Sequence, residues 1–268
     1  MVSIIIVNYH VKRELFSCIE SIIKSKPKAS YEIIIVDNDE EKTIHKELQK
    51  KLPKVIYIPN VNKGFGQGNN VGARRAKGDY LFFLNPDTKI FPNTVDNLVA
   101  FLEKNKKTGI VAPLLHDMQG KPYQQGAQEL TPVRGIICLS FVNKIFPKNQ
   151  IAQEYFLKKW DKKTIKEVDV IPGTAFMIRK NIFKKINGFD EKFFLYFEEF
   201  DLCRRIKALG WKILIYPEAK ACHSWGSSTK HREDIKSIFQ KSRFYYFKKH
   251  FGILPAVFTE SFLRMNKY

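Results

Sequence analysis

Roughly the first 90 residues alternate apolar runs with amphipathic segments, and this alternation constrains the fold more than any other feature. Apolar runs that predict buried strands occupy residues 2–7, 32–36, 55–58 and 80–84. The segments between them, such as residues 12–25, space their apolar residues as helices do. Strands that alternate with helices favour right-handed crossovers and a parallel sheet. We therefore expect an α/β fold with a mostly parallel central sheet flanked by helices.

Polar residues follow each of these four predicted strands. In chain order they are Asn8 and Tyr9, Asp37 and Asn38, Asn60 and Asn62, and Asn85 and Asp87. The carboxyl ends of parallel strands meet at one edge of a sheet, and ligands of open α/β sheets bind at that edge. Four polar strand ends in succession predict a site about the size of a nucleotide.

The fourth strand ends in the sequence YLFFLNPDT, residues 80–88. Pro86 lacks an N–H, so strand pairing should stop near it and leave Asn85 and Asp87 beyond the strand. An aspartate with an amide two residues before it can hold a divalent cation against a diphosphate. The alternative is a turn that needs Asn, Pro and Asp only for its backbone geometry.

The formal net charge of +19 indicates an anionic partner, which could be nucleic acid, anionic lipid or a phosphorylated substrate. A lysine-rich background that keeps the protein soluble is the alternative. No apolar run approaches the ~20 residues of a membrane span. The four cysteines lack metal-site spacing and MVSIIIVNYH lacks a basic leader, so we expect a reduced, cytoplasmic compartment.

The second half of the chain gives weaker patterns. We expect a helix over residues 92–105 and a strand over 110–115, whereas residues 124–166 are hard to interpret and suggest a mobile or substrate-facing insertion. Further on, Asn181 is a candidate cap for a short helix over residues 182–186. The remaining expectations are a strand over 175–178, a helix from Glu198 to a glycine cap at Gly210, a last strand over 211–216 closed by Pro217, a loop around His223, and a basic-aromatic helix over 232–250.

Two acids, Glu198 and Glu199, follow the aromatic-rich sequence FFLYF of residues 193–197. An aromatic wall raises the pKa of a carboxyl group toward that of a useful general base. We expect only one of the pair to enter a site, since neighbouring helical residues point to different faces. Stabilisation of the acids by the helix dipole is the structural alternative. Residues 64–68 are glycine-rich but are not a Walker loop, so they serve either close approach to a ligand or a tight turn.

Five segments of the chain carry a resemblance. They are VSIIIVNYH, EIIIVDN, NKGFGQGNNVGARRAKGDYLFFLNPDT, PGTAFMIRK and GFDEKFFLYFEEFDLCRRIKALGW. Together they resemble the family-2, GT-A-fold glycosyltransferases, and more narrowly the bacterial rhamnosyltransferase-like branch, over roughly residues 2–228. The resemblance implies a GT-A (Rossmann-like) sheet and an inverting transfer of a sugar from a nucleotide-sugar.

The resemblance also implies roles for individual residues. The family's Asp-X-Asp metal motif falls on Asn85-Pro86-Asp87, so Asp87 is expected to bind a divalent cation, Mn²⁺ or Mg²⁺. His223 is similar to a histidine that helps to hold metal or diphosphate in some relatives, and Glu199 matches the catalytic base. Residues expected to bind the nucleotide-sugar are Asn8, Tyr9, Asp37 (the base-recognising aspartate), Asn38, Asn62, Gly64, Gly66, Asn69, Asn85 and Asp87. Residues expected on the acceptor side or supporting it are Gly173, Glu198, Asp201 and Trp225.

The expected reaction moves a sugar, with rhamnose favoured, from a TDP- or UDP-sugar to a hydroxyl of a glycan or polyprenyl-pyrophosphate-linked acceptor in cell-surface polysaccharide synthesis. We expect a glycosyltransferase domain over residues 1–230, divided into a nucleotide-binding half (1–115) and an acceptor-binding, catalytic half (116–230). Residues 231–268 are predicted to form a basic amphipathic helical tail that lies on the anionic inner face of the cell membrane. A tail that packs its aromatic residues on the core is the alternative.

Two other functions compete with this one. A sugar nucleotidyltransferase uses a related fold, but it should carry a glycine-rich, basic triphosphate loop near the N-terminus, and residues 7–12 contain none. A nucleic-acid-binding protein would fit the charge and the aromatic residues. It would not need acids at successive strand ends, and no helix-turn-helix, zinc or RRM signature is present, so we expect no nucleic-acid partner.

Overall fold

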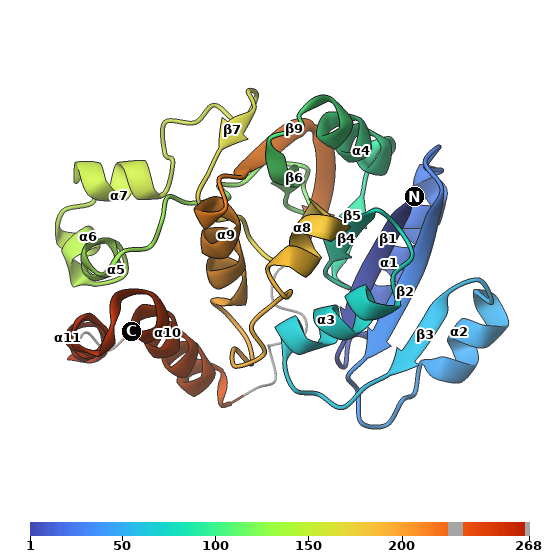
Figure 1. The fold of residues 1–268 in the computed structure, drawn as a ribbon, viewed down its shortest axis with the longest axis horizontal. Coiled ribbons are helices and arrows are strands. Elements are labelled where there is room, and N and C mark those ends of the chain that lie inside the picture. The colour runs from blue at the N-terminus through green and yellow to red at the C-terminus, as the bar shows by residue number, and fades with distance from the viewer. Residues whose placement is uncertain (225–232, 266–268) are drawn as a thin grey trace.

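The computed structural model describes residues 1–224 and 233–265 of the chain. Its centre is a nine-stranded sheet in the order β3-β2-β1-β4-β8-β6-β9-β5, with β7 paired to β9 (Figure 1). The strands are β1 (Val2–Asn8), β2 (Tyr31–Asp37), β3 (Ile56–Pro59), β4 (Tyr80–Leu84), β5 (Thr88–Ile90), β6 (Thr108–His116), β7 (Lys166–Glu167), β8 (Ala175–Arg179) and β9 (Lys212–His223).

The sheet is parallel in its first half and mixed in its second. Strands β3, β2, β1 and β4 pair in parallel, as the alternating sequence predicts. Strand β8 then runs antiparallel to both of its neighbours, β4 and β6, while β6 and β9 are parallel. The expected α/β fold with a central sheet flanked by helices is confirmed, and the parallel part is the part that carries the polar strand ends.

Helices cover both faces of the sheet because its strands are apolar on both sides. Ile4 and Ile6 of β1 pack in one core cluster with α1 (Lys12–Ser25), α2 (His45–Lys51) and α4 (Thr94–Lys104). Ile5 and Val7 point to the opposite cluster. The helices that contribute to that second cluster are α3 (Phe65–Arg75), α8 (Lys180–Lys185) and α9 (Glu198–Ala208).

Strand β9 is longer than the sequence suggests. The predicted stop at Pro217 is wrong, because the strand continues to His223. Its pairing with β6 shifts register between Pro113 and Leu114, and this irregularity accommodates the proline. His223 is therefore the last residue of a strand and not part of a loop. Residues 88–90, for which no strand was expected, form β5 and pair with this distal end of β9.

Residues 124–166 contain three short helices. They are α5 (Pro132–Cys138), α6 (Phe141–Ile145) and α7 (Gln150–Tyr155), whose N-termini are capped by the side chains of Thr131, Ser140 and Asn149. The proposed cap Asn181 is corrected: α8 begins at Lys180, and the Asn181 side chain accepts a hydrogen bond from the N–H of Ile182 inside the first turn.

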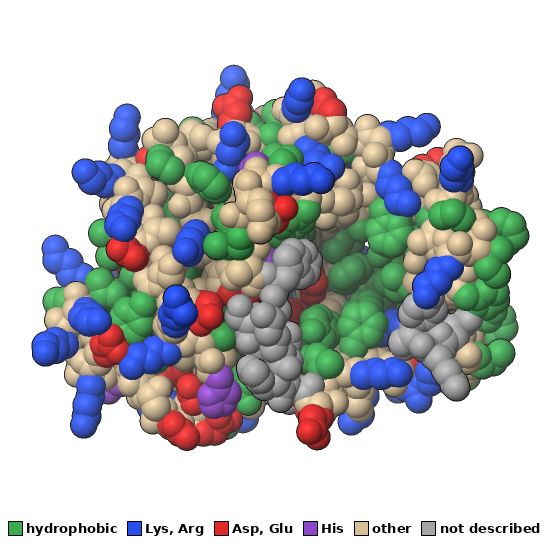
Figure 2. Space-filling view, turned by 180° about the vertical axis from the view of Figure 1, so that it is seen from behind, with side chains coloured by type: hydrophobic (Ala, Val, Ile, Leu, Met, Phe, Trp, Pro, Cys, Tyr) green, Lys and Arg blue, Asp and Glu red, His purple; other side chains and the backbone are tan. Residues whose placement is uncertain are grey.

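The tail forms two helices, α10 (Ile235–Phe251) and α11 (Ile253–Met265), and α10 packs on the domain. Tyr246 and Phe247 are fully buried against Phe193 and Phe197, so the aromatic residues of α10 belong to a third core cluster. Lysine and arginine side chains are spread over the face of the molecule that Figure 2 shows. None of the helices within residues 1–224 and 233–265 is both long and apolar enough to cross a membrane.

Candidate active site

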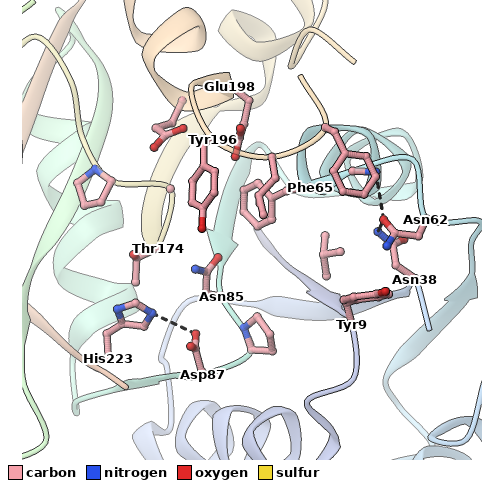
Figure 3. Close-up of a pocket in the computed structure, with 18 residues that line it drawn as sticks. Tyr9, Asn38, Asn62, Phe65, Asn85, Asp87, Thr174, Tyr196, Glu198 and His223 are labelled. Carbon is pink, nitrogen blue, oxygen red and sulfur yellow. Dashed lines mark hydrogen bonds and ion pairs between the residues drawn. The ribbon is translucent and has the colours of Figure 1, made fainter. Parts of the chain in front are cut away.

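A cavity of about 350 Å³ opens at the carboxyl edge of the parallel strands, roofed by the segment that leads into α9 (Figure 3). It brings together the ends of β1, β2 and β4, the start of α3, the segment before β8 and the end of β9. Its lining residues are Val7, Tyr9, Asn38, Asn62, Gly64, Phe65, Asn85, Pro86, Asp87, Pro172, Gly173, Thr174, Phe194, Leu195, Tyr196, Glu198, Glu199 and His223.

One side of the cavity is built from amides and aromatic rings. Asn38 donates its Nδ2–H to Oδ1 of Asn62 over 3.4 Å, and the same oxygen accepts the backbone N–H of Gly64 at 3.1 Å. Gly64 has a φ of +107°, and a Cβ there would lie 2.2 Å from the carbonyl oxygen of Phe194. Only glycine therefore lets the turn before α3 approach the segment before α9 this closely.

Asp37 lies behind this wall rather than in it. The residue is fully buried, and its two carboxylate oxygens accept hydrogen bonds of 2.8 Å from Asn8 Nδ2 and from the Tyr57 hydroxyl. Burial and the bond to Asp37 raise the pKa of Tyr57, which therefore stays protonated as a donor. The backbone N–H of Asp39 adds a bond of 3.3 Å to Oδ1, so three donors of the protein itself hold the carboxylate that the resemblance assigns to base recognition.

The opposite side of the cavity holds Asp87, Asn85 and His223. The Nε2 atom of His223 lies 3.1 Å from Oδ1 of Asp87, and both side chains are buried. The pairing of His223 with Thr88, between β9 and β5, places the imidazole there. The Oδ1 atom of Asn85 is buried and has no hydrogen-bond partner among the described residues. A carboxylate, an imidazole and an unsatisfied amide oxygen form a donor set that suits Mn²⁺ and, through the oxygens, Mg²⁺.

Glu198 and Glu199 both line the cavity from the first turn of α9, so the expectation that only one would enter is wrong. The two residues before them, Tyr196 and Phe197, each have a φ of +68°. This left-handed pair turns the chain sharply into the helix, at a conformational cost of about 1–3 kcal/mol per residue. The strain is stored next to the carboxylates.

The carboxyl groups of the two glutamates are incompletely hydrogen-bonded. An Oε2 atom of each is buried and finds no hydrogen-bond partner in the described part of the chain, although Glu199 keeps part of its surface exposed. Burial raises the pKa of Glu199 to about 7, against the opposing effect of backbone hydrogen bonds from Glu199 and Phe197. Burial and the neighbouring charge of Glu199 raise the pKa of Glu198 well above its ordinary value. A carboxyl group that titrates near neutrality suits general acid–base chemistry.

A second cavity of about 320 Å³ shares Glu199 and Pro172 with the first. Its walls come from the segment after β6, the end of α7, the segment before β8 and the start of α9. The other residues that line it are Tyr123, Gln124, Gln125, Gly126, Ala127, Tyr155, Phe156, Val170, Ile171 and Phe200. Glu199 therefore stands at the boundary between two cavities.

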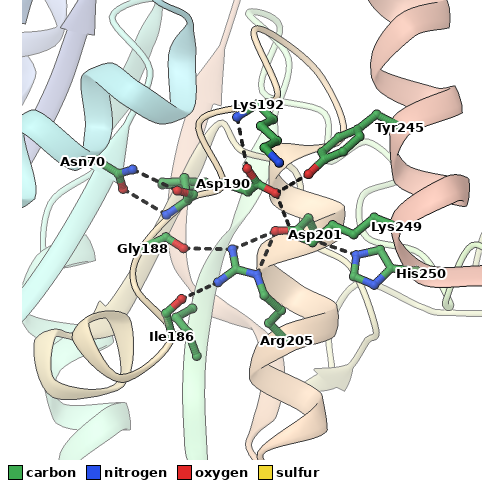
Figure 4. A network of polar contacts seen from close by, with 11 residues as sticks. Asn70, Ile186, Gly188, Asp190, Lys192, Asp201, Arg205, Tyr245, Lys249 and His250 are labelled. Atoms are coloured by element: carbon green, nitrogen blue, oxygen red, sulfur yellow. Dashed lines mark hydrogen bonds and ion pairs between the residues drawn. The ribbon is translucent and has the colours of Figure 1, made fainter.

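Asp201, two residues further along α9, does not line either cavity. It is fully buried and receives hydrogen bonds of 2.8 Å from Arg205 and from His250, and Lys249 lies 2.5 Å away (Figure 4). Burial acts to raise the pKa of Asp201, but the His250 hydrogen bond and the charges of Arg205 and Lys249 outweigh it and lower the pKa to about 2. Lys249 also pairs with Asp190 at 2.7 Å. Asp201 thus fastens α9 to α10.

The structure divides the other predicted site residues into lining and supporting positions. Tyr9, Asn38, Asn62, Gly64 and Gly173 line the first cavity. Three others support the walls: Asn8 bonds Asp37, Gly66 packs on Phe189, and Asn69 donates to the carbonyl of Phe65 at 3.0 Å. Trp225 lies outside the described residues.

Sequence reasoning missed several lining residues. Phe65, Thr174, Phe194 and Tyr196 face the first cavity, and Tyr123 and Tyr155 the second. The aromatic-rich run before Glu198 was a signal for Phe194 and Tyr196, because those rings follow directly on the turn that carries the acids. No local pattern distinguishes Tyr155, whose position depends on how α7 folds back.

The sequence of residues 3–186 matches the profile of a family described as glycosyl transferase family 2. The chain belongs to this family. Relatives named in the next paragraph extend the match beyond α9, which the profile does not reach. The family's enzymes are glycosyltransferases, and an inverting transfer fits the family.

Two relatives are rhamnosyltransferases, which agrees with the branch that the sequence motifs indicate. The chain is 26% identical over 265 residues to rhamnosyltransferase WbbL of Escherichia coli strain K12, which covers 95% of this chain and 92% of that protein. It is 24% identical over 232 residues to an N-acetylglucosaminyl-diphospho-decaprenol L-rhamnosyltransferase of Mycobacterium tuberculosis, over 82% of this chain and 73% of that protein.

Solved structures share the fold. GalNAc-T7, crystallised with UDP, GalNAc and Mn²⁺, superposes with a TM-score of 0.64 at 19% identity, and the match covers 92% of this chain but 49% of that chain. The chain thus spans about half the length of GalNAc-T7. Residues 1–349 of TarS from S. aureus, in complex with UDP-GlcNAc, superpose with a TM-score of 0.58 at 16% identity, covering 98% and 71% of the two chains.

Proposed function

We propose that this glycosyltransferase moves a sugar, with rhamnose favoured, from a TDP- or UDP-sugar to a hydroxyl of a glycan or polyprenyl-pyrophosphate-linked acceptor in cell-surface polysaccharide synthesis. The observation that carries the proposal is Glu199, an incompletely hydrogen-bonded carboxyl group with a pKa of about 7 at the junction of two cavities. The rhamnose preference rests on the two rhamnosyltransferase relatives.

The first cavity takes the donor. Asn38, Asn62 and Tyr9 offer amide and hydroxyl groups at the nucleoside side of the sheet edge. Asp37 is fully buried and does not line the cavity, whereas Asn38 and Asn62 do. We therefore assign direct contact with the uracil or thymine base to Asn38 and Asn62, and a supporting role to Asp37.

Asp87, Asn85 and His223 would hold the divalent cation. A bound Mn²⁺ or Mg²⁺ neutralises the charge that the diphosphate gains as it leaves. The buried, unsatisfied Oδ1 of Asn85 supports this assignment, since a cation would complete its coordination. Asparagine in place of the first aspartate of the motif leaves two oxygen donors and one fewer negative charge than an Asp-X-Asp site.

The second cavity takes the acceptor. Its rings, Tyr123, Tyr155, Phe156 and Phe200, and its amides, Gln124 and Gln125, are groups suited to the apolar faces and hydroxyls of a saccharide. Glu199 accepts the proton of the acceptor hydroxyl. The hydroxyl oxygen bonds to the anomeric carbon while the bond from that carbon to the diphosphate oxygen breaks on the opposite face. One displacement inverts the centre, so no second carboxylate nucleophile is needed.

A thermal-shift panel of TDP, UDP, GDP and CDP and their sugars, with and without Mn²⁺ or Mg²⁺, tests the donor assignment. A ligand that binds only the folded state raises the melting temperature. We expect a shift with TDP or UDP that grows with the cation and shrinks in Asp87→Asn. No shift with any nucleotide would overturn the donor site and leave the polar strand ends as structural features.

The nucleotide that binds determines which nucleotide-sugars are used in a transfer assay. The full-length protein is incubated with the matching nucleotide-sugars and a lipid-linked saccharide, and the product is detected by mass spectrometry. We expect transfer with inversion at the anomeric carbon. A nucleotide-sugar formed from sugar phosphate and nucleoside triphosphate would instead support the nucleotidyltransferase alternative.

A further inference from the structure

One region of the surface is apolar although the chain as a whole is strongly basic. Helix α11 exposes Leu254 by 79% and Phe258 by 67%, together with Ile253 and Val257. The segment at the end of α6 exposes Ile145 by 60% and Phe146 by 62%. We call these residues, with Val133 and Phe141, the apolar face. Figure 2 shows apolar side chains along the edge of the molecule at its right.

The exposed residues of α11 form a stripe and are not scattered. Ile253, Leu254, Val257 and Phe258 follow the spacing i, i+1, i+4, i+5, which places them on one side of a helix. The opposite side of the helix carries Ala256, Thr259, Glu260 and Leu263, all of which are buried. The side toward the domain thus includes a polar anchor, Glu260 paired with Arg243, whereas the outward side is apolar and no charged residue interrupts residues 253–258.

Two segments far apart in the sequence share this face. Helix α5 contacts both α6 and α11. The ring of Phe141 on α6 stacks on that of Phe262 on α11, with 5.9 Å between the centroids. The insertion of residues 124–166 and the end of the chain therefore meet in one surface. Single exposed apolar residues are ordinary, but a contiguous group marks an interaction site.

Charge identifies the partner. Lysines flank the exposed apolar residues in the sequence Lys144-Ile145-Phe146-Pro147-Lys148, and Lys248 lies in the last turn of α10, shortly before the stripe begins. Apolar residues bordered by lysines fit an anionic bilayer surface, where the rings enter the headgroup region and the cations meet phosphates. The net charge of +19 opposes the association of two copies through this face.

We propose that the apolar face docks on the surface of an anionic bilayer, with Phe146, Leu254 and Phe258 entering the headgroup region. The physiological reason rests on the proposed function, since a lipid-linked acceptor lies in such a bilayer. This docking surface narrows the prediction from the sequence, which assigned docking to the whole tail of residues 231–268, and it adds α6. The aromatic residues of α10 are largely taken up by the core, and the exposed contact comes from α11 and α6.

Co-sedimentation of the full chain with vesicles tests the proposal. The vesicles contain equal parts of phosphatidylglycerol and phosphatidylcholine, with pure phosphatidylcholine for comparison. We expect binding to the anionic vesicles that weakens with salt, and a loss of about 100-fold in partitioning for the double variant Leu254→Ser/Phe258→Ser, roughly tenfold per apolar side chain. Phe146→Ser should lower binding by about tenfold from the other segment.

Controls separate this surface from general effects. Ile165→Ser removes an apolar side chain that is 52% exposed outside the apolar face and should leave binding unchanged. All variants alter exposed side chains, so their melting temperatures should match that of the original chain. Lys144→Gln/Lys148→Gln should reduce binding to anionic vesicles without affecting the residual binding to phosphatidylcholine.

Two outcomes would overturn the proposal. One is equal vesicle binding by the original chain and the double variant, including no binding by either. The other is a dimer in analytical ultracentrifugation that Leu254→Ser/Phe258→Ser converts to a monomer, which would make the face an interface between copies. Vesicle binding requires no donor or acceptor, so its failure is distinct from a failure of sugar transfer.

Discussion

The first turn of α9 carries carboxylates in two contrasting environments. Glu199 faces two cavities, has a buried oxygen without a partner, and has a pKa raised to about 7. Asp201 is buried among Arg205, Lys249 and His250, and its pKa is lowered to about 2. Both carboxylates are at least partly buried, so burial alone does not decide the direction of the pKa shift. The cationic partners decide it.

The two environments depend on each other. The strained residues Tyr196 and Phe197 aim the glutamates into the cavities, and such strain persists only where the surroundings hold it. Asp201 supplies part of that support. Arg205, which it binds, also donates to the carbonyls of Ile186 and Gly188, on the segment that leads to the strained turn. The paired carboxylate of Asp201 thus helps to hold the turn that positions Glu199.

The largest expected effect is the loss of transfer in Glu199→Gln. General-base catalysis contributes about 100- to 10,000-fold, and glutamine cannot accept the proton. We expect a decrease of that size in kcat, with the thermal shift by nucleotide retained, because the donor cavity keeps its other walls. Undiminished activity in this variant would refute Glu199 as the base. Glu191→Gln, at an exposed position, is the matched control.

The second-largest expected effect is a loss of stability when Asp201, the paired carboxylate, is neutralised. Asp201→Asn should lower the free energy of unfolding by about 3 kcal/mol, since it leaves Lys249, Arg205 and His250 without their buried counter-charge. Urea denaturation monitored by circular dichroism measures it. A change below about 0.5 kcal/mol would show that the network is not an anchor. The smaller loss expected from Lys249→Met separates one ion pair from the whole cluster.

The pKa shifts of Glu199 and Asp201 have opposite signs, so neutralising each side chain should change stability in opposite directions. The pKa of Glu199 is higher in the folded than in the unfolded state, so the contribution of this group to stability is lost as pH rises from about 4 to 7. Glu199→Gln should therefore raise the free energy of unfolding at pH 8, by about 1–2 kcal/mol after allowance for the partial exposure of the residue. Denaturation of both variants at pH 8 provides the test, and destabilisation by Glu199→Gln would contradict it.

Because the pKa values of Glu199 and Asp201 differ, activity and stability should be lost in different pH ranges. Transfer needs deprotonated Glu199, so kcat should fall about fivefold between pH 7 and pH 6. The pKa of Asp201 is depressed in the folded state, so its stabilisation is fully present above the unfolded pKa of about 4 and is lost as pH falls toward 2. The protein at pH 5.5 should be folded and nearly inactive. Full activity at that pH would argue against the high pKa of Glu199.

Much of the structure of residues 1–115 could be predicted because its signals are local. Apolar runs that end in polar residues give the four parallel strands, and Pro86 marks the end of strand pairing after Leu84. Tyr9, Asn38, Asn62, Asn85 and Asp87 then meet at one edge for topological reasons, and they do line the cavity.

The features that the sequence did not predict depend on contacts between residues far apart in the chain. The continuation of β9 past Pro217 requires the register shift against β6, which the local sequence does not contain. Asp37 lies behind the cavity wall, where its carboxylate accepts a hydrogen bond from Tyr57 on the neighbouring strand, β3. The tail appeared basic and amphipathic, yet Tyr246 and Phe247 are in the core because the domain offers Phe193 and Phe197 to pack against.

The close contact of Gly64 with Phe194 has a consequence for how this enzyme can evolve. A side chain at position 64 would collide with a backbone atom of the segment that leads to Glu199. Substitution of Gly64 is therefore not tolerated unless the turn before α3 and the segment before α9 move together. Under the proposed function, donor preference can instead change at lining positions beside this contact, such as Tyr9, Asn62 and Phe65, without altering the carboxylates of α9.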